Sequence, residues 1–389
     1  MGEHDHLNSI IIILLAGIVG VGFLFYNEYY LAIKPAITEP PKQVKNIQED
    51  RRNSTTTEKK NNTNNENNTS TQQKNLKKKN LKIGKNKTNI PLSVPEGFKI
   101  EVLTNKVPEA RDIEKGPRGN LWVSRTDKGA ITMIDLDSDD GKLGNVQDIF
   151  TDMYNPHGIE FHPENKFQLY IAEEDKISKV TLYSEKSSLE TVANLPTGGR
   201  HYTRSLEFGP NNNLFASIGS TCDVCKEENS KHGTIQKVNT NTGELTQYAT
   251  GLRNAVFFEW SSINNKMWAT EMGRDNLGDD LPPDEINIIE RGQDYGWPLC
   301  YSDNIYDKKF NGAPNKETPC QDKEPSHIDL QAHVAPLGFD FVPTSTTWSE
   351  KYKDDLLVAY HGSWNRSVPV GYKIKWIKLN ENRELKNRD

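Results

Sequence analysis

Short apolar segments recur along the chain at a nearly constant spacing. Each starts with Leu or Met, continues with apolar residues and ends on a small or polar residue. The copies are NLWVSR at 120–125, QLYIAE at 168–173, NLFASI at 213–218, KMWATE at 266–271 and DLLVAY at 355–360. Successive copies lie 48, 45, 53 and 89 residues apart, so the last interval must contain an insertion. Each copy follows a turn such as GPRGN and precedes a second apolar strand such as AITMIDL. This pattern predicts the blades of an all-β propeller.

The five copies account for about five blades of such a propeller. A sixth blade would have to come from beyond residue 389, and the strand GFKIEVL at 97–103 could complete the last blade from the N-terminal side. Ligand sites of propellers are expected over the central channel, where strand ends and loops converge.

The first 90 residues have a different character from the remainder. Ile10 to Tyr26 form an uncharged, mostly apolar run of 17 residues, near the lower limit for a membrane span. We expect an uncleaved transmembrane helix within residues 1–30. A cleaved signal peptide is the alternative, although no Lys or Arg precedes the run and no small-x-small site follows it. Lysines after the run would favour a cytoplasmic domain under the positive-inside rule, but other features favour the outside.

Residues 31–90 are rich in Asn, Thr, Lys and Gln and poor in large apolar residues. Such a segment cannot bury enough surface to offset its ordering entropy, so it is predicted to be a disordered linker. Its Asn-x-Ser/Thr sequons give weak support for an outside location; they include Asn53, Asn67, Asn68 and Asn86. Residues 91–389 would then form the propeller domain.

The balance of basic and acidic residues also changes near residue 90. Residues 1–90 hold 14 Lys and Arg against 8 Asp and Glu, whereas the remainder holds 34 against 46. A net-acidic domain argues against nucleic acid as a partner.

The four cysteines form two local pairs, Cys222 with Cys225 and Cys300 with Cys320. Structural disulfides in an oxidising compartment are favoured at these spacings. Zinc is the alternative, but it would need both pairs brought together, and the usual metal-knuckle glycines are absent. A c-type haem is excluded because Lys226, rather than His, follows Cys225.

Residues 251–298 contain the most concentrated set of candidate ligand-binding residues in the chain. GLRN is followed by TEMGRD, a run of carboxylates and a Tyr-Gly-Trp-Pro corner within one repeat-sized unit. This mixture suggests a pocket at strand ends that holds a polyanionic ligand and a hard cation.

Several motifs together resemble the glucose/sorbosone dehydrogenase family of six-bladed propellers that bind pyrroloquinoline quinone (PQQ) with calcium. They are RHYTRSLEFGP at 200–210, GLRN at 251–254, TEMGRD at 270–275, DEINIIERGQDYGWP at 284–298, HVAPLGF at 333–339 and HGSWNRS at 361–367. The Cys-Asp-Val-Cys insertion and the HGSWNRS segment bring the chain closer to the sorbosone-dehydrogenase-like branch. Family members continue into a final blade past this point.

The resemblance implies roles for individual residues. His201 matches the catalytic histidine, a neutral imidazole that takes the hydroxyl proton while hydride leaves for the quinone. Arg253, Asn254 and Arg366 match cofactor-binding positions. Gly273 and Arg274 match the positions whose backbone carbonyls hold calcium, although Arg274 replaces a proline of soluble glucose dehydrogenases. For some of these residues, structural roles remain as alternatives: a turn histidine for His201, and for Arg253 an arginine paired with a carboxylate.

Two departures weaken the match to the cofactor clamp. A lysine expected shortly after HVAPLGF is replaced by Asp340, Phe341 and Val342, and a second arginine near Trp376 is absent. His333 and His361 could face substrate or be buried. Asp279, Asp280, Asp284 and Glu285 lack EF-hand spacing and are expected to be solvated or loop-capping.

The resemblance implies an oxidoreductase that converts an aldose or sugar aldehyde to a lactone or acid, and the apolar run and the cysteine pairs favour a membrane-anchored, extracytoplasmic domain. Its electrons would pass to a separate cytochrome, copper protein or quinone, because no haem motif is present. The alternatives are a calcium-dependent lactonase-like hydrolase and a non-catalytic extracellular binding propeller.

Overall fold

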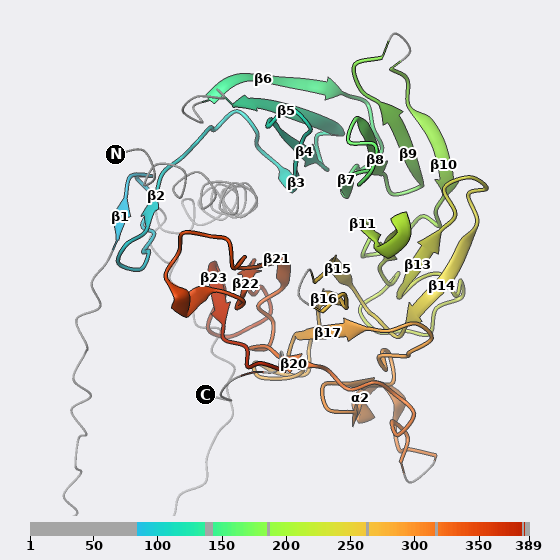
Figure 1. The fold of residues 1–389 in the computed structure, drawn as a ribbon. Helices are drawn as coiled ribbons and strands as arrows, with labels where there is room; N and C mark the ends of the chain where they lie inside the picture. Colours follow the sequence, from blue (N-terminus) through green and yellow to red (C-terminus); the bar gives the residue numbers. More distant parts are fainter. Residues whose placement is uncertain are drawn as a thin grey trace, which may run out of the picture.

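The computed structural model describes residues 84–136, 143–184, 187–261, 264–315, 318–382 and 385. Five antiparallel sheets, here called blades one to five, stand around a common centre (Figure 1). Blade one contains β3 (Ala110–Lys115), β4 (Leu121–Arg125), β5 (Ala130–Leu136) and β6 (Leu143–Phe150). Blade two contains β7 (Ile159–Phe161), β8 (Gln168–Ala172), β9 (Lys176–Thr181) and β10 (Glu190–Asn194).

The next three blades continue the same order from the centre outward. Blade three contains β11 (Leu206–Gly209), β12 (Asn213–Ile218), β13 (Thr234–Val238) and β14 (Leu245–Thr250). Blade four contains β15 (Ala255–Trp260), β16 (Met267–Glu271), β17 (Glu285–Ile289) and β20 (Ile328–Asp329). Blade five contains β21 (Pro336–Phe341), β22 (Leu356–Tyr360) and β23 (Lys373–Ile377). The predicted all-β propeller is therefore confirmed, with five blades in the described part of the chain.

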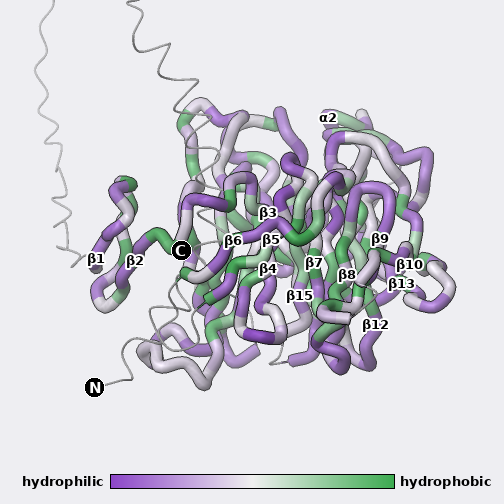
Figure 2. The backbone as a smooth tube through the Cα atoms, turned by 90° about the horizontal axis from the view of Figure 1, so that it is seen from above, coloured by the Kyte–Doolittle hydropathy of each residue, from purple (hydrophilic) through white to green (hydrophobic). Residues whose placement is uncertain are grey.

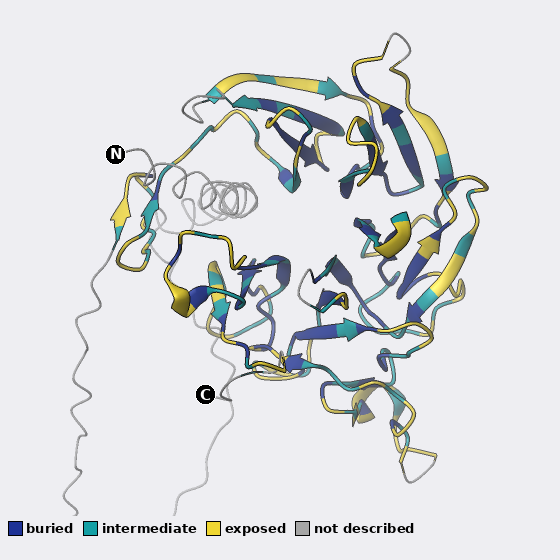
Figure 3. Ribbon diagram, viewed as in Figure 1, coloured by how far each residue is buried: buried dark blue, intermediate teal, exposed yellow. Residues whose placement is uncertain are grey.

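The five repeated segments of the sequence form the second strand of each blade, and the apolar strands that follow them form the third. Side chains pack on both faces of these strands, so β4 and β16 are buried along their whole length. The outer strands β6 and β14 are largely exposed, as Figure 3 shows. Hydrophobic stretches accordingly follow strands such as β7 and β8, whereas many connecting loops are hydrophilic (Figure 2).

Each pair of neighbouring blades encloses its own hydrophobic cluster. Between blades four and five, Trp268 and Ile286 pack with Phe339, Leu356 and Val358, all of them buried. Comparable clusters join the other successive blades from one to four. Removing a large side chain from such a cluster costs about 3–5 kcal/mol for a Trp or Phe, so the blades depend on one another for stability.

The insertion predicted between the last two repeats lies between β17 and β21. It holds a hairpin of β18 (Cys300–Tyr301) and β19 (Ile305–Tyr306), the short helix α2 (Lys308–Asn311), and β20. Two 3-10 turns, Pro210–Asn212 and Glu350–Tyr352, complete the elements. Disulfides join Cys222 to Cys225 and Cys300 to Cys320, which confirms the predicted pairing.

The N-terminal strand does not extend blade five as expected. Strand β2 (Lys99–Ile100) pairs in parallel with β1 (Lys85–Asn86), which lies inside the segment assigned to the linker. The contact with blade five is instead aromatic, because Phe98 meets Trp348 edge-on at 5.1 Å and Tyr352 at 5.4 Å between ring centroids. The β1–β2 pair lies on the side of the ring between blades five and one (Figure 1).

Within the described ranges, no helix has the length and apolar character needed to cross a bilayer. The apolar run Ile10 to Tyr26 and the linker up to residue 83 lie outside those ranges.

Candidate functional site

The site residues gather at one end of the propeller. The second strands end there at Ile218, Glu271 and Tyr360, and the segments that lead into the inner strands meet them through backbone hydrogen bonds. Ser220 N donates to Arg253 O at 2.8 Å. The structure thus brings together segments about 30 to 160 residues apart; we call this end the site face.

His201 lies in the segment that joins blade two to blade three. Its Nδ1 is 2.8 Å from Ser220 Oγ and 3.1 Å from Ser220 O. Gly219 makes this approach possible, because a Cβ atom there would lie 2.5 Å from the Cβ of His201 and 3.0 Å from Asn254 Oδ1. A glycine at this position therefore lets His201 and Asn254 flank the same strand end.

The hydrogen bonds of Ser220 indicate the tautomer of His201. Ser220 Oγ donates its proton to Cys222 O at 2.8 Å, so it accepts from the ring. Nδ1 must then carry the proton, and Nε2, which contacts no donor or acceptor in the described part of the chain, presents a lone pair. Burial, followed by the charges of Arg253 and Arg200, lowers the pKa of His201 to about 2. The imidazole is neutral at physiological pH.

Arg253 is buried, with 4% of its surface exposed, and binds acceptors of the protein in several directions. Its Nε donates to Asp223 O at 2.8 Å and its Nη2 to Asp223 Oδ1 at 2.9 Å. Nη1 donates to Met272 O at 3.2 Å, and Asp275 Oδ2 lies 3.5 Å from Nη2. The structure therefore places this predicted cofactor residue in an ion pair with two carboxylates.

Gly273 and Arg274 leave two backbone carbonyls available. Gly273 N donates to Asp284 Oδ1 at 2.8 Å, whereas neither residue's carbonyl accepts a hydrogen bond from the described residues. The guanidinium of Arg274 turns away and pairs with Asp307 Oδ2 at 2.8 Å. The charge that departs from the family pattern is thus neutralised beside α2, and the two carbonyl oxygens remain suited to a hard cation.

The four carboxylates of this loop region have structural roles. Asp284 is buried and accepts from Gly273 N and from Ala335 N, each at 2.8 Å. Burial raises its pKa to about 6 despite these bonds. Glu285 is likewise buried and accepts from Ser302 N at 2.6 Å, so these two carboxylates bind backbone N–H groups of loops rather than solvent. Asp279 and Asp280 bind the segment that carries Arg366.

Arg366 contacts a loop rather than an open cleft. Its Nη2 donates to Asp280 Oδ1 at 3.1 Å, and its Nη1 donates to Asp279 O. Ser367 N donates to Asp279 Oδ1 at 3.1 Å. On the inner side of the same loop, His333 Nε2 contacts Gly278 O at 2.8 Å, so His333 is a buried, hydrogen-bonded histidine.

Asp275 is a central residue that the sequence did not single out. Its carboxylate accepts from Arg200 Nη2 at 2.7 Å and Asn365 Nδ2 at 3.1 Å, and its backbone N donates to Asp223 Oδ1 at 2.8 Å. Asp275 therefore links the His201 segment, the cystine loop and the HGSWNRS segment. Two sequence features could have pointed to this network: Asp275 follows Gly-Arg in TEMGRD, and its partner Asp223 lies between Cys222 and Cys225.

The donor set fits an anionic ligand held beside a cation. Arg200 keeps 43% of its side chain exposed and meets the ring of Trp364, itself 69% exposed, at 5.7 Å. The lone pair of His201 and the carbonyls of Gly273 and Arg274 complete the set. Because Arg253 and Arg366 already bind protein acceptors, their contribution to a ligand would be mainly electrostatic.

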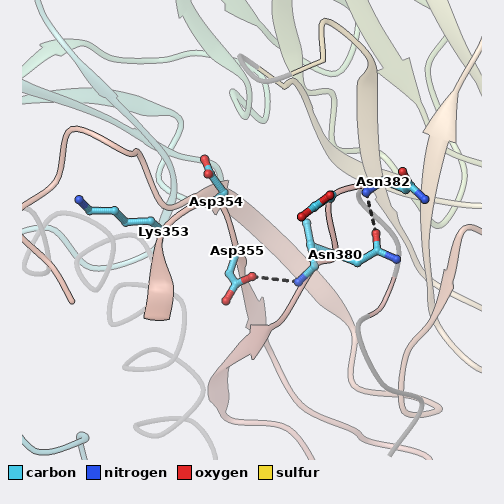
Figure 4. A pocket seen from close by; sticks show the side chains of 7 residues that line it. Lys353, Asp354, Asp355, Asn380 and Asn382 are labelled. Carbon is cyan, nitrogen blue, oxygen red and sulfur yellow. Dashed lines mark hydrogen bonds between the residues drawn. The ribbon is translucent and has the colours of Figure 1, made fainter. Parts of the chain in front are cut away.

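One hollow lies within this arrangement, and a larger one lies away from it. A small cavity of about 30 Å³, lined by Arg253, Glu271, Gly273 and Arg274 among others, has room for about one water molecule. The larger hollow, of about 550 Å³, is lined by Lys353, Asp354, Asp355, Leu379, Asn380, Glu381 and Asn382 (Figure 4). It precedes β22, whereas the site face follows the end of that strand, so it belongs to the opposite end of the propeller.

Known proteins share both sequence and fold with this chain. Residues 92–388 match the TrAA12-like family. An uncharacterized protein of Borreliella burgdorferi is 33% identical over 305 residues, which cover 74% of this chain and 76% of that protein. A pyrroloquinoline quinone-dependent pyranose dehydrogenase of Coprinopsis cinerea is 25% identical over 333 residues, which cover 73% of this chain and 44% of that longer protein.

Solved structures show the same architecture. The holo form of the Coprinopsis cinerea pyranose dehydrogenase PQQ domain has a TM-score of 0.64 at 19% identity and covers 79% of this chain and 83% of its own. The calcium structure of the Trichoderma reesei AA12 protein has a TM-score of 0.62 at 20% identity, covering 72% and 80%. The chain therefore belongs to the TrAA12-like family, and the predicted resemblance to PQQ-dependent sugar dehydrogenases is confirmed.

Proposed function

We propose that this protein is a PQQ- and calcium-dependent dehydrogenase that oxidises an aldose or sugar aldehyde to a lactone or acid. The observation that carries the proposal is the neutral His201, whose Nε2 lone pair is open while Ser220 holds Nδ1. Its relatives include a PQQ-dependent pyranose dehydrogenase. When bound, PQQ would supply the hydride-accepting quinone, and calcium would polarise it as a Lewis acid.

The chain's own residues would bind, orient and move a proton. Arg253, Asn254 and Arg366 would hold the anionic cofactor, and the carbonyls of Gly273 and Arg274 would hold calcium. His201 Nε2 would take the proton from the hydroxyl on the anomeric carbon. An anion near Arg253 would offset the positive charge that depresses the pKa of His201, which would make the imidazole a stronger base.

We further propose an extracytoplasmic domain on a single-pass membrane anchor, with a separate cytochrome, copper protein or quinone as electron acceptor. The two disulfides support an oxidising compartment. A lactonase-like hydrolase is less well supported, because carboxylates at the site face bind arginines and backbone N–H groups. A purely binding propeller would not need the open lone pair of His201.

The test is dye reduction by the full chain with PQQ, calcium and a panel of aldoses. We expect activity that requires both additions and falls at least about 100-fold in His201→Ala, the scale of lost general-base catalysis. His162→Ala is the matched control, since His162 caps a turn of blade two through Glu164 N at 3.2 Å. Activity that survives in His201→Ala, or needs neither addition, would contradict the proposal.

A further inference from the structure

Two parts of the candidate site depend on one four-residue loop. This loop, here called the cystine loop, spans residues 222–225 between β12 and β13 and is closed by the disulfide between Cys222 and Cys225. It binds the arginine of the site directly and the histidine through Ser220, and its only charged residue is Asp223.

Asp223 fixes Arg253 through two different groups. The carbonyl oxygen accepts from Arg253 Nε at 2.8 Å, and Oδ1 accepts from Arg253 Nη2 at 2.9 Å. The same Oδ1 accepts from Asp275 N at 2.8 Å, and the carbonyl also accepts from Trp297 Nε1 at 3.3 Å. Because the guanidinium is planar, two contacts along one edge set both its position and its orientation.

The first residue of the cystine loop acts on the histidine. Cys222 O accepts the proton of Ser220 Oγ at 2.8 Å, and this leaves Ser220 Oγ as an acceptor for His201 Nδ1 at 2.8 Å. If Cys222 moved, the hydroxyl of Ser220 would be free to donate to Nδ1, and only Ser220 O, at 3.1 Å, would still favour a proton on that nitrogen. Where the hydroxyl donates to Nδ1, the proton resides on Nε2, and the base loses its lone pair.

The two disulfides differ in their access to solvent. Cys300 and Cys320 are 5% and 4% exposed, whereas Cys222 and Cys225 are partly exposed and Lys226 beside them is exposed. A dithiol in solution therefore meets the cystine loop first. In that exchange the dithiol gives two electrons and two protons, the bond between the cysteines breaks to two thiols, and the reductant becomes a disulfide.

We propose that the cystine loop is a redox-sensitive positioning element of the site. Asp223 positions Arg253, Cys222 positions His201 through Ser220, and reduction of the disulfide releases both. The inference rests on the proposed function for its biological meaning, but the positioning itself is a property of the apo chain. It assigns Asp223 as a positioning residue and makes activity dependent on the thiol–disulfide state of the compartment.

The first experiment follows His201 by nitrogen NMR of the histidine side chains in the full chain, with His201→Gln to assign its signals. In the oxidised protein we expect a proton on Nδ1 and no titration between pH 5 and 8. After treatment with dithiothreitol, with alkylation confirming that only Cys222 and Cys225 react, we expect part of the population to carry its proton on Nε2. An unchanged tautomer in the reduced protein would overturn the proposal.

The second experiment measures PQQ affinity in the presence of calcium. Reduction and Asp223→Asn should each weaken binding about tenfold, the scale of one lost charge-assisted hydrogen bond. Asp148→Asn is the control, because it makes the same change beside Arg125, at 3.0 Å, in blade one. Equal affinity in Asp223→Asn and Asp148→Asn would reject the role of Asp223. If the oxidised wild-type chain binds no PQQ, the proposed function fails, while the NMR result still decides the inference.

Discussion

Charge is handled differently at the site face and in the central channel. At the site face four arginines pair with carboxylates: Arg200 with Asp275, Arg253 with Asp223, Arg274 with Asp307 and Arg366 with Asp280. Strand β3 carries Asp112, and every innermost strand has one carboxyl at an equivalent position beside the axis: Glu114, Glu160, Glu207, Glu259 and Asp340. No Lys or Arg of the described residues forms an ion pair with these five, here called the channel carboxyls.

The pKa values of the channel carboxyls are raised, because no cation of the described residues is paired with them. Burial raises the pKa of Glu114 to about 8 and that of Asp340 to about 6, and neighbouring acids add to the shift of Glu114. The pKa values of Glu160, Glu207 and Glu259 are raised well above the ordinary range, first by burial and then by neighbouring acids, Glu114 among them in each case. The contrast teaches that the site face holds its carboxylates beside arginines, whereas in the channel burial without a paired cation favours the protonated form of the acids.

The largest expected effect comes from breaking a pair at the site face. Arg253→Met would leave Asp223 and Asp275 without their shared cation in a buried setting, which should lower the free energy of unfolding by about 3–5 kcal/mol. Urea unfolding measures this. In the control Lys266→Met, the partner Glu290 is half exposed, so the loss should stay below about 1 kcal/mol. Equal losses in the two variants would show that the buried pairing is unimportant.

Crowding beside His201 should give the next largest effect. Gly219→Ala would place a Cβ atom 2.5 Å from the Cβ of His201 and 2.9 Å from its carbonyl oxygen. Overpacking of this kind costs about 1–3 kcal/mol, and it should also displace the imidazole and reduce dye reduction. Gly338→Ala meets no atom within 4 Å and is the control for unfolding and activity. A Gly219→Ala protein as stable and active as that control would contradict the close approach.

The raised pKa values of the channel carboxyls predict that the free energy of unfolding falls as pH rises. Glu114 binds its proton up to about pH 8 in the folded state but only to about its ordinary 4.5 when unfolded. Between these values the folded state binds more protons, so the free energy of unfolding decreases with increasing pH. Glu114→Gln should therefore raise stability at pH 8 by about 1 kcal/mol or more, and should flatten the pH dependence.

The control for this experiment is the exposed Glu244→Gln, followed by thermal unfolding from pH 5 to 8. If the stability of the Glu114→Gln protein depended on pH as steeply as that of the wild type, the raised pKa of Glu114 would be contradicted.

The smallest effect is expected at the exposed edge of the site face. Asp280 is 89% exposed although its partner Arg366 is only 10% exposed, so Asp280→Asn should change the free energy of unfolding by less than about 1 kcal/mol. Urea unfolding at low and high salt would measure it. A loss as large as that of Arg253→Met would remove the distinction between buried and exposed pairs.

The repeated strands and the disulfide pairs could be predicted from the sequence, because both depend on local pattern and spacing. The strand NLWVSR needs only its apolar run and its flanking turns to be recognised, and it forms β4. Cys222 and Cys225 are close enough in sequence to pair in a loop.

The charge network could not be predicted, because it depends on contacts between distant segments. Asp275 joins Arg200, Asn365 and the Asp223 carboxylate across separations of up to 90 residues. An acid in each inner strand is visible in the sequence, as in SLEFGP, but strand alternation allows such a residue to face solvent. Only the ring arrangement places Glu207 near Glu114 and Glu259.

The central claim is that the site face binds PQQ through calcium. Isothermal titration calorimetry of PQQ into the full chain, with calcium and then with a calcium chelator, tests it most directly. The account predicts one PQQ per chain in calcium and a large loss of affinity in the chelator. Absence of binding in calcium, or binding of equal affinity in the chelator, would contradict it.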